Sequence, residues 1–249
     1  MLRRQRETCP WEIQPSGPGL AGCGIIRLSS DRVNLPAVAS CLHIHPENPQ
    51  ARLVDQAVDM ANRGGLLVCP TDTCYALMCR IDARSAQERL RLIRQLDVQH
   101  DLSLIFSSLS QLSDYAKLDD RSFRLVRRLL PGPYTLVLPA TRDVPRRLSS
   151  PQKRSIGVRI PGDPICQALL ARLGEPLMGS TLQLPGMEFP LVDPDDICER
   201  TGNRVDLVLL GRPGRRECST ILDFCVWPPK VLRRGAGALK PLEDTGILL

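Results

Sequence analysis

Short apolar runs alternate with segments of helical periodicity along most of the chain from about residue 41 onward. Alternating or continuous apolar residues predict strands, at 41–45, 66–69, 103–106, 134–138, 155–160, 177–180, 207–210, 219–224 and 231–233. Apolar residues three and four positions apart predict helices over 83–94, 110–115, 120–130, 164–173 and from 194 onward. A further helix is expected between Asn48-Pro49 and Gly64-Gly65.

Local signals mark the ends of these helices. Asn48-Pro49, Asp163-Pro164 and Asp193-Pro194 each supply an N-cap residue followed by proline at the first helical position. Gly64-Gly65 and Pro131-Gly132-Pro133 end the helices that precede them. Because strands and helices interleave throughout, we expect an α/β fold: one mixed parallel and antiparallel sheet with helices packed on it, in a single domain.

The first 40 residues differ from the rest of the chain. Gly, Pro, Ser and Arg dominate them, the stretch 15–19 resembles a linker, and no helical or strand period persists. Residues 1–40 are therefore predicted to be a disordered extension, although a mis-assigned translation start would explain the same composition. We expect the folded domain at 41–240 and a C-terminal tail at 241–249.

Composition is that of a globular protein, with 43% hydrophobic and 24% charged residues among 249. No apolar run approaches the roughly 18 to 20 residues that span a membrane, and no apolar segment follows the N-terminal arginines as in a signal peptide. These features predict a cytoplasmic protein.

Ten cysteines are compatible with disulfides or a zinc site, but their context favours neither. Cys69, Cys166, Cys198 and Cys225 lie in apolar patterns, as small buried residues do. No Cys-x-x-Cys pair is present, and nothing supplies the second pair that a zinc site would need beside Cys74 and Cys79. We therefore expect free thiols in a reducing compartment.

The net charge of +6 rests on arginine, because only four lysines are present. A basic balance favours partners such as nucleotides or RNA, and a basic loop is expected at Arg142, Arg146, Arg147, Lys153 and Arg154. The alternative explanation is that the nucleotide composition of the genome enriches arginine. In addition, an aromatic content of 4% leaves few side chains on which nucleic-acid bases can stack.

The three histidines give little sign of a metal site. His43 and His45 share one face of a predicted strand, which is more often an ordinary polar face. His100 lies in a polar loop and is expected to be solvated. We predict no metal site.

Small polar clusters recur at the ends of predicted strands, namely at 71–73, 135, 159, 180–181 and 219–220. Hydroxyls and a guanidinium that converge on one cleft suit the recognition of phosphate and carboxylate. Pro70-Thr71-Asp72-Thr73 alone could equally be an ordinary turn. No phosphate loop, nucleophile elbow or dinucleotide fingerprint is present. Chemistry by positioning and charge stabilisation therefore fits better than covalent catalysis.

Taken together, these motifs resemble the YrdC-like family over about residues 42–240. The resemblance is carried by Gly64-Gly65 through Pro70-Thr71-Asp72-Thr73-Cys74-Tyr75, Pro131-Gly132-Pro133-Tyr134-Thr135, Val158-Arg159-Ile160-Pro161 and Ser219-Thr220-Ile221-Leu222-Asp223. The nearer resemblance is to the YciO branch, through 45–50, 93–96, 144–148 and 184–189. It implies a twisted mixed sheet around a deep, positively charged cavity.

The resemblance also implies an activity and its site. Family members are nucleotidyltransferases that make L-threonylcarbamoyladenylate from threonine, bicarbonate and ATP for tRNA adenosine modification, and they are described as binding double-stranded RNA. ATP with Mg²⁺ would be a substrate, and no tightly bound cofactor is implied. Carried over by position, Thr73 and Arg159 would meet threonine. The nucleotide would meet Arg94, Thr135, Thr181, Gln183, Ser219 and Arg233. No catalytic residue is identified.

Two motifs depart from the family pattern. Arg94-Gln95-Leu96 stands where active synthases carry Lys-x-Arg, and Thr181-Leu182-Gln183 stands where they carry Ser-x-Asn. Leu96 removes a cation, so we expect weakened or altered synthase activity. Two alternatives remain: a binding module for structured RNA that performs no chemistry, and a related carbamoyl-transfer or reverse reaction on modified tRNA.

Overall fold

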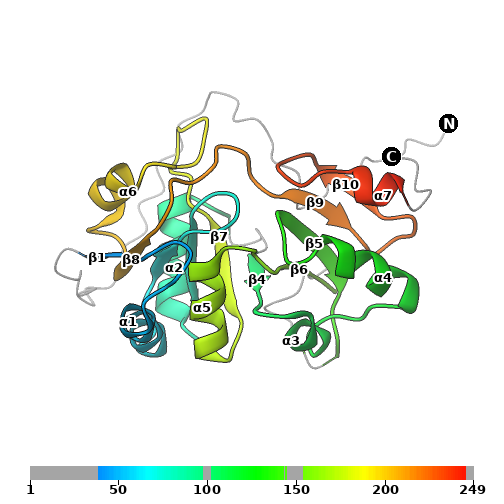
Figure 1. The fold of residues 1–249 in the computed structure, drawn as a ribbon, viewed down its shortest axis with the longest axis horizontal. Coiled ribbons are helices and arrows are strands. Elements are labelled where there is room, and N and C mark those ends of the chain that lie inside the picture. The colour runs from blue at the N-terminus through cyan, green and yellow to red at the C-terminus, as the bar shows by residue number, and fades with distance from the viewer. Residues whose placement is uncertain (1–38, 98–101, 143, 145–153, 245–249) are drawn as a thin grey trace, which may run out of the picture.

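The computed structural model describes residues 39–97, 102–142, 144 and 154–244. In this part of the chain the strands form one ten-stranded sheet in the order β1-β8-β2-β3-β7-β4-β6-β5-β9-β10 (Figure 1). The strands are β1 (Ser40–His43), β2 (Leu67–Cys69), β3 (Ala76–Arg80), β4 (Ser103–Ile105), β5 (Tyr134–Pro139), β6 (Ser155–Arg159), β7 (Leu177–Thr181), β8 (Leu207–Leu210), β9 (Thr220–Asp223) and β10 (Lys230–Arg233). The helices are α1 (Ala51–Asn62), α2 (Arg84–Arg94), α3 (Leu109–Ser113), α4 (Asp120–Leu129), α5 (Pro164–Leu173), α6 (Pro194–Thr201) and α7 (Lys240–Glu243).

Both strand directions occur in this sheet, which confirms the predicted mixed α/β fold. The pairs β1–β8, β8–β2, β4–β6 and β5–β9 are parallel, and the remaining neighbours are antiparallel. Figure 1 shows the helices in two groups, with α1, α2, α5 and α6 beside one half of the sheet and α3, α4 and α7 beside the other. Strand β4 lies between the two halves.

The core lies on both faces of the sheet. In β3, Leu77 belongs to the larger apolar cluster and Met78 to the smaller one, and both side chains are completely buried. Strand β3 is absent from the predicted elements because no glycine or proline adjoins its apolar run, whereas β2 lies between Gly64-Gly65 and Pro70. Helix α7 is also absent from them, since four residues are too few to show a helical period.

Two of the three predicted N-caps are confirmed. Asp163 accepts a hydrogen bond from the Cys166 amide at 3.0 Å, and Asp193 accepts from the Asp195 and Asp196 amides at 3.0 and 3.2 Å. The cap predicted at Asn48 is wrong, because α1 begins at Ala51 with Gln50 before it. The His45 ring accepts from the Asn48 amide at 3.1 Å, so this residue belongs to a turn that delays the helix.

The prediction that all cysteines are free thiols is wrong for Cys41 and Cys198. A disulfide joins them, tying β1 to α6 with 6.4 Å between the Cα atoms. Their sequence separation of 157 residues carries no local signal of pairing. The cysteines of the described chain outside this bridge are Cys69, Cys74, Cys79, Cys166, Cys218 and Cys225.

Several predictions lie outside the described residues. These are the structure of residues 1–38, the solvated His100, and the basic-loop members Arg146, Arg147 and Lys153. The expected boundary at residue 240 falls inside α7, whose Leu242 is buried. No helix within the described ranges is long and apolar enough to cross a membrane.

Candidate functional site

The loop between β2 and β3 holds one end of the Arg159 guanidinium. Its Nη2 donates to Thr71 Oγ1 at 3.1 Å, to Thr73 Oγ1 at 2.6 Å and to Asp72 Oδ1 at 2.5 Å. The side chains of Arg159 and Asp72 are only 9% and 16% exposed, so this is a largely buried ion pair. The other Asp72 oxygen accepts from the Gly162 amide at 3.1 Å. Thr73 and Arg159, both predicted site residues, therefore lie together.

A second group of predicted residues is centred on Ser219. The hydroxyls of Thr135 and Ser219 are 2.7 Å apart, and both residues are buried. Arg233 donates to the Ser219 carbonyl from Nε at 3.1 Å and from Nη2 at 2.8 Å, and to its hydroxyl at 3.3 Å. The Ala236 amide donates to the Cys218 carbonyl, and a side chain at Gly235 would collide with that carbonyl. Residues 218–220 are thus held tightly against the chain after β10.

The third group joins the two motifs that depart from the family pattern. Arg94, at the end of α2, donates from Nη1 to the Gln183 carbonyl just beyond β7. The Gln183 side-chain amide donates to the carbonyls of Met187 and Glu188 at 2.9 and 3.2 Å. Leu96 packs against the large apolar cluster. Arg94 therefore contacts the backbone of residue 183, while the nitrogen of the Gln183 amide is used within its own loop.

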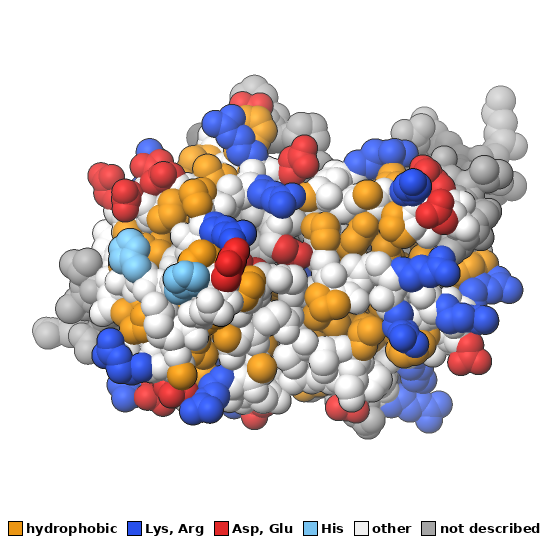
Figure 2. Space-filling model, in the orientation of Figure 1, with side chains coloured by type: hydrophobic (Ala, Val, Ile, Leu, Met, Phe, Trp, Pro, Cys, Tyr) orange, Lys and Arg blue, Asp and Glu red, His pale blue; other side chains and the backbone are white. Residues whose placement is uncertain are grey.

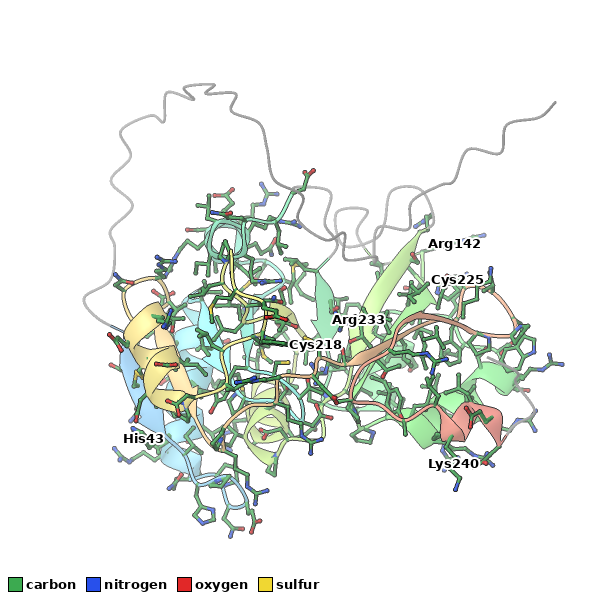
Figure 3. The ribbon with its side chains drawn as sticks, turned by 90° about the horizontal axis from the view of Figure 1, so that it is seen from above. His43, Arg142, Cys218, Cys225, Arg233 and Lys240 are labelled. Atoms are coloured by element: carbon green, nitrogen blue, oxygen red, sulfur yellow. A yellow bond between two sulfur atoms is a disulfide. The ribbon has the colours of Figure 1, made fainter. Side chains whose placement is uncertain are left out.

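A cysteine connects the three groups. The Cys218 thiol interacts by hydrogen bonds with Cys74 and Thr181, and the positive charges of Arg233 and Arg159 act on it. The Cys74 hydrogen bond and these cations lower the pKa of Cys218 to about 6. Burial lowers the pKa of both Arg94 and Arg233, and the Cys218 charge opposes that effect in each. Figure 3 shows Cys218 and Arg233 near the middle of the molecule, between its two halves.

The contact between the β2–β3 loop and residues 159–162 requires a strongly non-planar sheet. The pairing directions place the carboxyl ends of β2 and β6 at opposite edges of an ideal flat sheet, four strand-to-strand steps apart. The hydrogen bonds of Asp72 with Arg159 and Gly162 join these ends, so the sheet departs strongly from a flat one, as twisted sheets do.

Two buried nitrogen atoms in this site are unpaired. Within the described chain, Nε of Arg94 and Nε of Arg159 have no hydrogen-bond partner. A buried donor without an acceptor is costly, and a guanidinium matches carboxylate and phosphate groups. The donor set therefore suits an anionic ligand.

A cavity of about 560 Å³ adjoins the second group, lined by residues 226–234. It includes Arg233, together with Trp227, Lys230 and Arg234. The Arg121 guanidinium lies over the Trp227 ring, 4.8 Å from its centroid. Figure 2 shows basic and acidic side chains interspersed on the face in view, with basic ones numerous on the side of β5, β9 and β10.

Sequence reasoning predicted one site with Thr73, Arg94, Thr135, Arg159, Thr181, Gln183, Ser219 and Arg233, and the structure brings these residues into the connected groups above. It missed Asp72 as a partner of Arg159, although a carboxylate between two threonines was the available signal. The contact between Cys74 and Cys218 was also missed, because Cys74 stands in a family motif without an assigned role and Cys218 carries no motif. In the described ranges no group of three His, Cys, Asp or Glu side chains could hold a metal.

The chain is similar to known proteins over most of its length. A model of the Sua5/YciO/YrdC family, described as "Telomere recombination", matches residues 59–235. YciO of Escherichia coli K12 is 44% identical over 199 residues, which are 80% of this chain and 97% of that protein. A protein of Haemophilus influenzae is 41% identical over 200 residues, with the same shares.

Solved structures show the same relationship. The crystal structure of E. coli YciO aligns with a TM-score of 0.78 at 43% identity, covering 82% of this chain and 98% of that one. The crystal structure of P. abyssi Sua5 complexed with L-threonine aligns with a TM-score of 0.75 at 25% identity. That alignment covers 83% of this chain and 60% of the Sua5 chain.

Proposed function

The chain belongs to the Sua5/YciO/YrdC family, and from this premise we propose that its cleft binds a threonine-like amino acid next to ATP. The reaction would be the formation of L-threonylcarbamoyladenylate, at a rate well below that of an active synthase. The proposal includes a cytoplasmic location, where ATP and tRNA are available.

Arg159 carries the amino-acid half of this proposal. Thr71, Asp72 and Thr73 fix one end of its guanidinium, while its buried Nε has no partner in the described chain. A ligand carboxylate would satisfy that donor by a charge-assisted hydrogen bond. The L-threonine complex of Sua5 supports an amino acid as the ligand.

The nucleotide half uses the groups around Ser219 and Arg94. Two guanidinium groups and the hydroxyls of Thr135, Thr181 and Ser219 are suited to phosphate oxygens. In the proposed reaction the threonylcarbamate oxygen attacks the α-phosphorus of Mg²⁺–ATP and pyrophosphate leaves. The residues would align the two reactants and stabilise the charge that develops on phosphate oxygens.

The lower rate follows from donors that are missing or already used. Leu96 contributes an apolar side chain where active synthases have a cation, and it packs against the core. The Gln183 amide nitrogen donates to Met187 and Glu188 within its own loop. Loss of one charge-stabilising donor typically reduces turnover by roughly 10²–10³-fold. We therefore expect binding to be retained better than catalysis.

Binding and turnover can be measured separately. Threonine and ATP should each raise the melting temperature, because only ligands that bind the native state do so. Arg159→Met should abolish the shift with threonine and leave most of the shift with ATP. Pyrophosphate release should be detectable but far slower than for an active synthase of the family. Absence of any shift at millimolar ligand would overturn the binding site, and turnover at the level of an active synthase would overturn the weakened activity.

Binding of structured RNA is the second candidate, and the cavity with Trp227, Lys230, Arg233 and Arg234 favours it. Cationic side chains contact phosphates, and such contacts weaken with salt. Filter binding of a duplex RNA at several salt concentrations measures this. An affinity that survives excess ATP and Arg159→Met would support an RNA surface outside the cleft, whereas a salt-independent affinity would contradict phosphate contacts.

A further inference from the structure

Two thiols that are distant in sequence meet in the candidate site. Cys74 lies near the end of the loop that holds Arg159, and Cys218 immediately precedes Ser219. Their sulfur atoms lie 3.5 Å apart, with Cys74 as the donor, although 144 residues separate them. The Cys74 sulfur also lies 3.4 Å from the Glu217 carbonyl oxygen. Neither belongs to a disulfide.

The surroundings make the two thiols unequal. The hydrogen bond from Cys74, the charges of Arg233 and Arg159 and a hydrogen bond with Thr181 favour the thiolate at Cys218. The hydrogen bond with Cys218 and burial raise the pKa of Cys74. Cys218 is partly exposed and Cys74 is buried, so a solvent-borne reagent reaches Cys218 first. The pair thus consists of an accessible thiolate and a neighbouring thiol.

A second pair in the same chain provides a contrast. Cys69 and Cys166 are also close to each other, but both are completely buried. Burial, the hydrogen bond with Cys166 and the nearby Asp163 charge raise the pKa of Cys69. A buried neutral thiol is unreactive. Proximity of two cysteines therefore does not make a reactive pair, and the nearby charges of Arg233 and Arg159 distinguish Cys218.

We propose that Cys74 and Cys218 are an oxidation site for peroxides, with Cys218 as the attacking sulfur and Cys74 as the resolving thiol. The Cys218 thiolate attacks one peroxide oxygen and the O–O bond breaks. Cys218 becomes a sulfenic acid, and the other oxygen leaves as hydroxide, which takes up a proton to form water. The Cys74 sulfur then attacks the Cys218 sulfur, the S–O bond breaks, and the hydroxyl leaves with the Cys74 proton as water. Two thiols and hydrogen peroxide thereby give one disulfide and two waters.

The geometry requires only a small movement. A disulfide bond is about 2.05 Å long, so the sulfur atoms must approach by roughly 1.5 Å from their 3.5 Å separation. The bond would link the loop that holds Arg159 to the segment that holds Ser219 and Arg233. It would also remove the negative charge that these arginines face. If the proposed function is correct, oxidation joins the amino-acid wall of the cleft to its nucleotide wall.

Peroxide treatment of the full-length protein followed by peptide mapping tests the proposal. Tryptic cleavage yields residues 64–80 with Cys69, Cys74 and Cys79, and residues 217–230 with Cys218 and Cys225. Fragment spectra of the linked peptides must therefore assign the bond to 74 and 218. Cys225→Ser is the matched control and should leave the cross-link intact. Cys74→Ser should instead trap a sulfenic acid at Cys218, detected as a dimedone adduct.

The wild-type protein provides a test that needs no variant. At pH 6, a thiol of pKa about 6 is half ionised, whereas the same residue in the denatured chain, at its ordinary 9.0, is about one part in a thousand ionised. The thiolate of the more acidic thiol is also about 20-fold less nucleophilic, which offsets part of this difference in the ionised fraction. Iodoacetamide should therefore modify Cys218 roughly 20-fold faster in the folded protein. Equal or slower modification on folding, or a peroxide-treated protein without the 74–218 link, would overturn the proposal. Neither readout depends on ATP or threonine binding.

Discussion

Replacement of Arg159 by methionine should destabilise the protein much more than the same change at a surface arginine. Arg159 and Asp72 form an ion pair at 2.5 Å with side chains 9% and 16% exposed. Removing one partner of a buried pair typically costs about 3–5 kcal/mol, because the other charge is left buried. The Gly162 amide still donates to Asp72, so we expect the lower end, about 3 kcal/mol. In a chain of this size that corresponds to roughly 6–12 °C in melting temperature.

Arg172 supplies the matched control. It pairs with Asp55 at 2.7 Å, but the two side chains are 63% and 46% exposed. Exposed pairs contribute about 1 kcal/mol or less, so Arg172→Met should shift the melting temperature only slightly. Urea unfolding with a common slope would give both free-energy differences.

A double variant separates the buried charge from lost packing. Asp72→Asn removes the carboxylate charge, so adding it to Arg159→Met should recover part of the lost stability. Equal losses for Arg159→Met and Arg172→Met would refute the buried-pair reasoning, as would a further loss on adding Asp72→Asn. Methionine retains an unbranched apolar stem at position 159, which keeps the packing change small.

Three further predictions use other parts of the molecule. Leu96→Arg should raise pyrophosphate release at least about 10-fold by restoring a cation. The control Leu92→Arg adds the same charge at a side chain that is 76% exposed, and it should not raise the rate. Asp193→Ala should cost about 1 kcal/mol in unfolding free energy through loss of the α6 cap, and an unchanged urea midpoint would contradict that role. The pKa of Cys218 falls on folding, so ionisation of this thiol stabilises the folded protein. This contribution to stability is complete above pH 9.0 and is lost as the pH falls through about 6. Stability of the wild-type protein relative to Cys218→Ser should therefore decline over that range, and a constant difference would argue against a folded-state thiolate.

Features coded within a few residues were predictable from the sequence. The caps at Asp163 and Asp193 depend on amides two or three positions away, so the local pattern sufficed. Asn48 had the same pattern, but its amide bonds to the His45 ring, and this competing turn was not recognisable from the Asn-Pro pair. The apolar strand β2 was visible as a run between Gly64-Gly65 and Pro70, whereas the equally apolar β3 has no glycine or proline beside it to mark its ends.

The site was predictable as a set of residue types, but its pairings were not. Hydroxyls and arginines at predicted strand ends indicated an anion site, and motif resemblance selected the same positions. The contacts of Arg159 with Asp72 and of Cys74 with Cys218 cross 87 and 144 residues of chain. These contacts depend on sheet order and twist, which composition and periodicity do not specify. The Cys41–Cys198 disulfide escaped prediction for the same reason.

The strand order also has a consequence for folding kinetics. Strand β8 lies between β1 and β2, yet it follows both by most of the length of the chain, as the pairing of Leu67 with Leu207 shows. Closing such long loops carries an entropic cost before any pairing is gained, and sheets of this kind fold slowly. During synthesis, β1 has no strand partner until β8 is made, whereas β2 can pair with β3 directly after it. The β2–β3 loop must still wait for residues 217–218, which its Cys74 contacts. We therefore expect the candidate site to form only near the end of folding, with β1 unpaired until then.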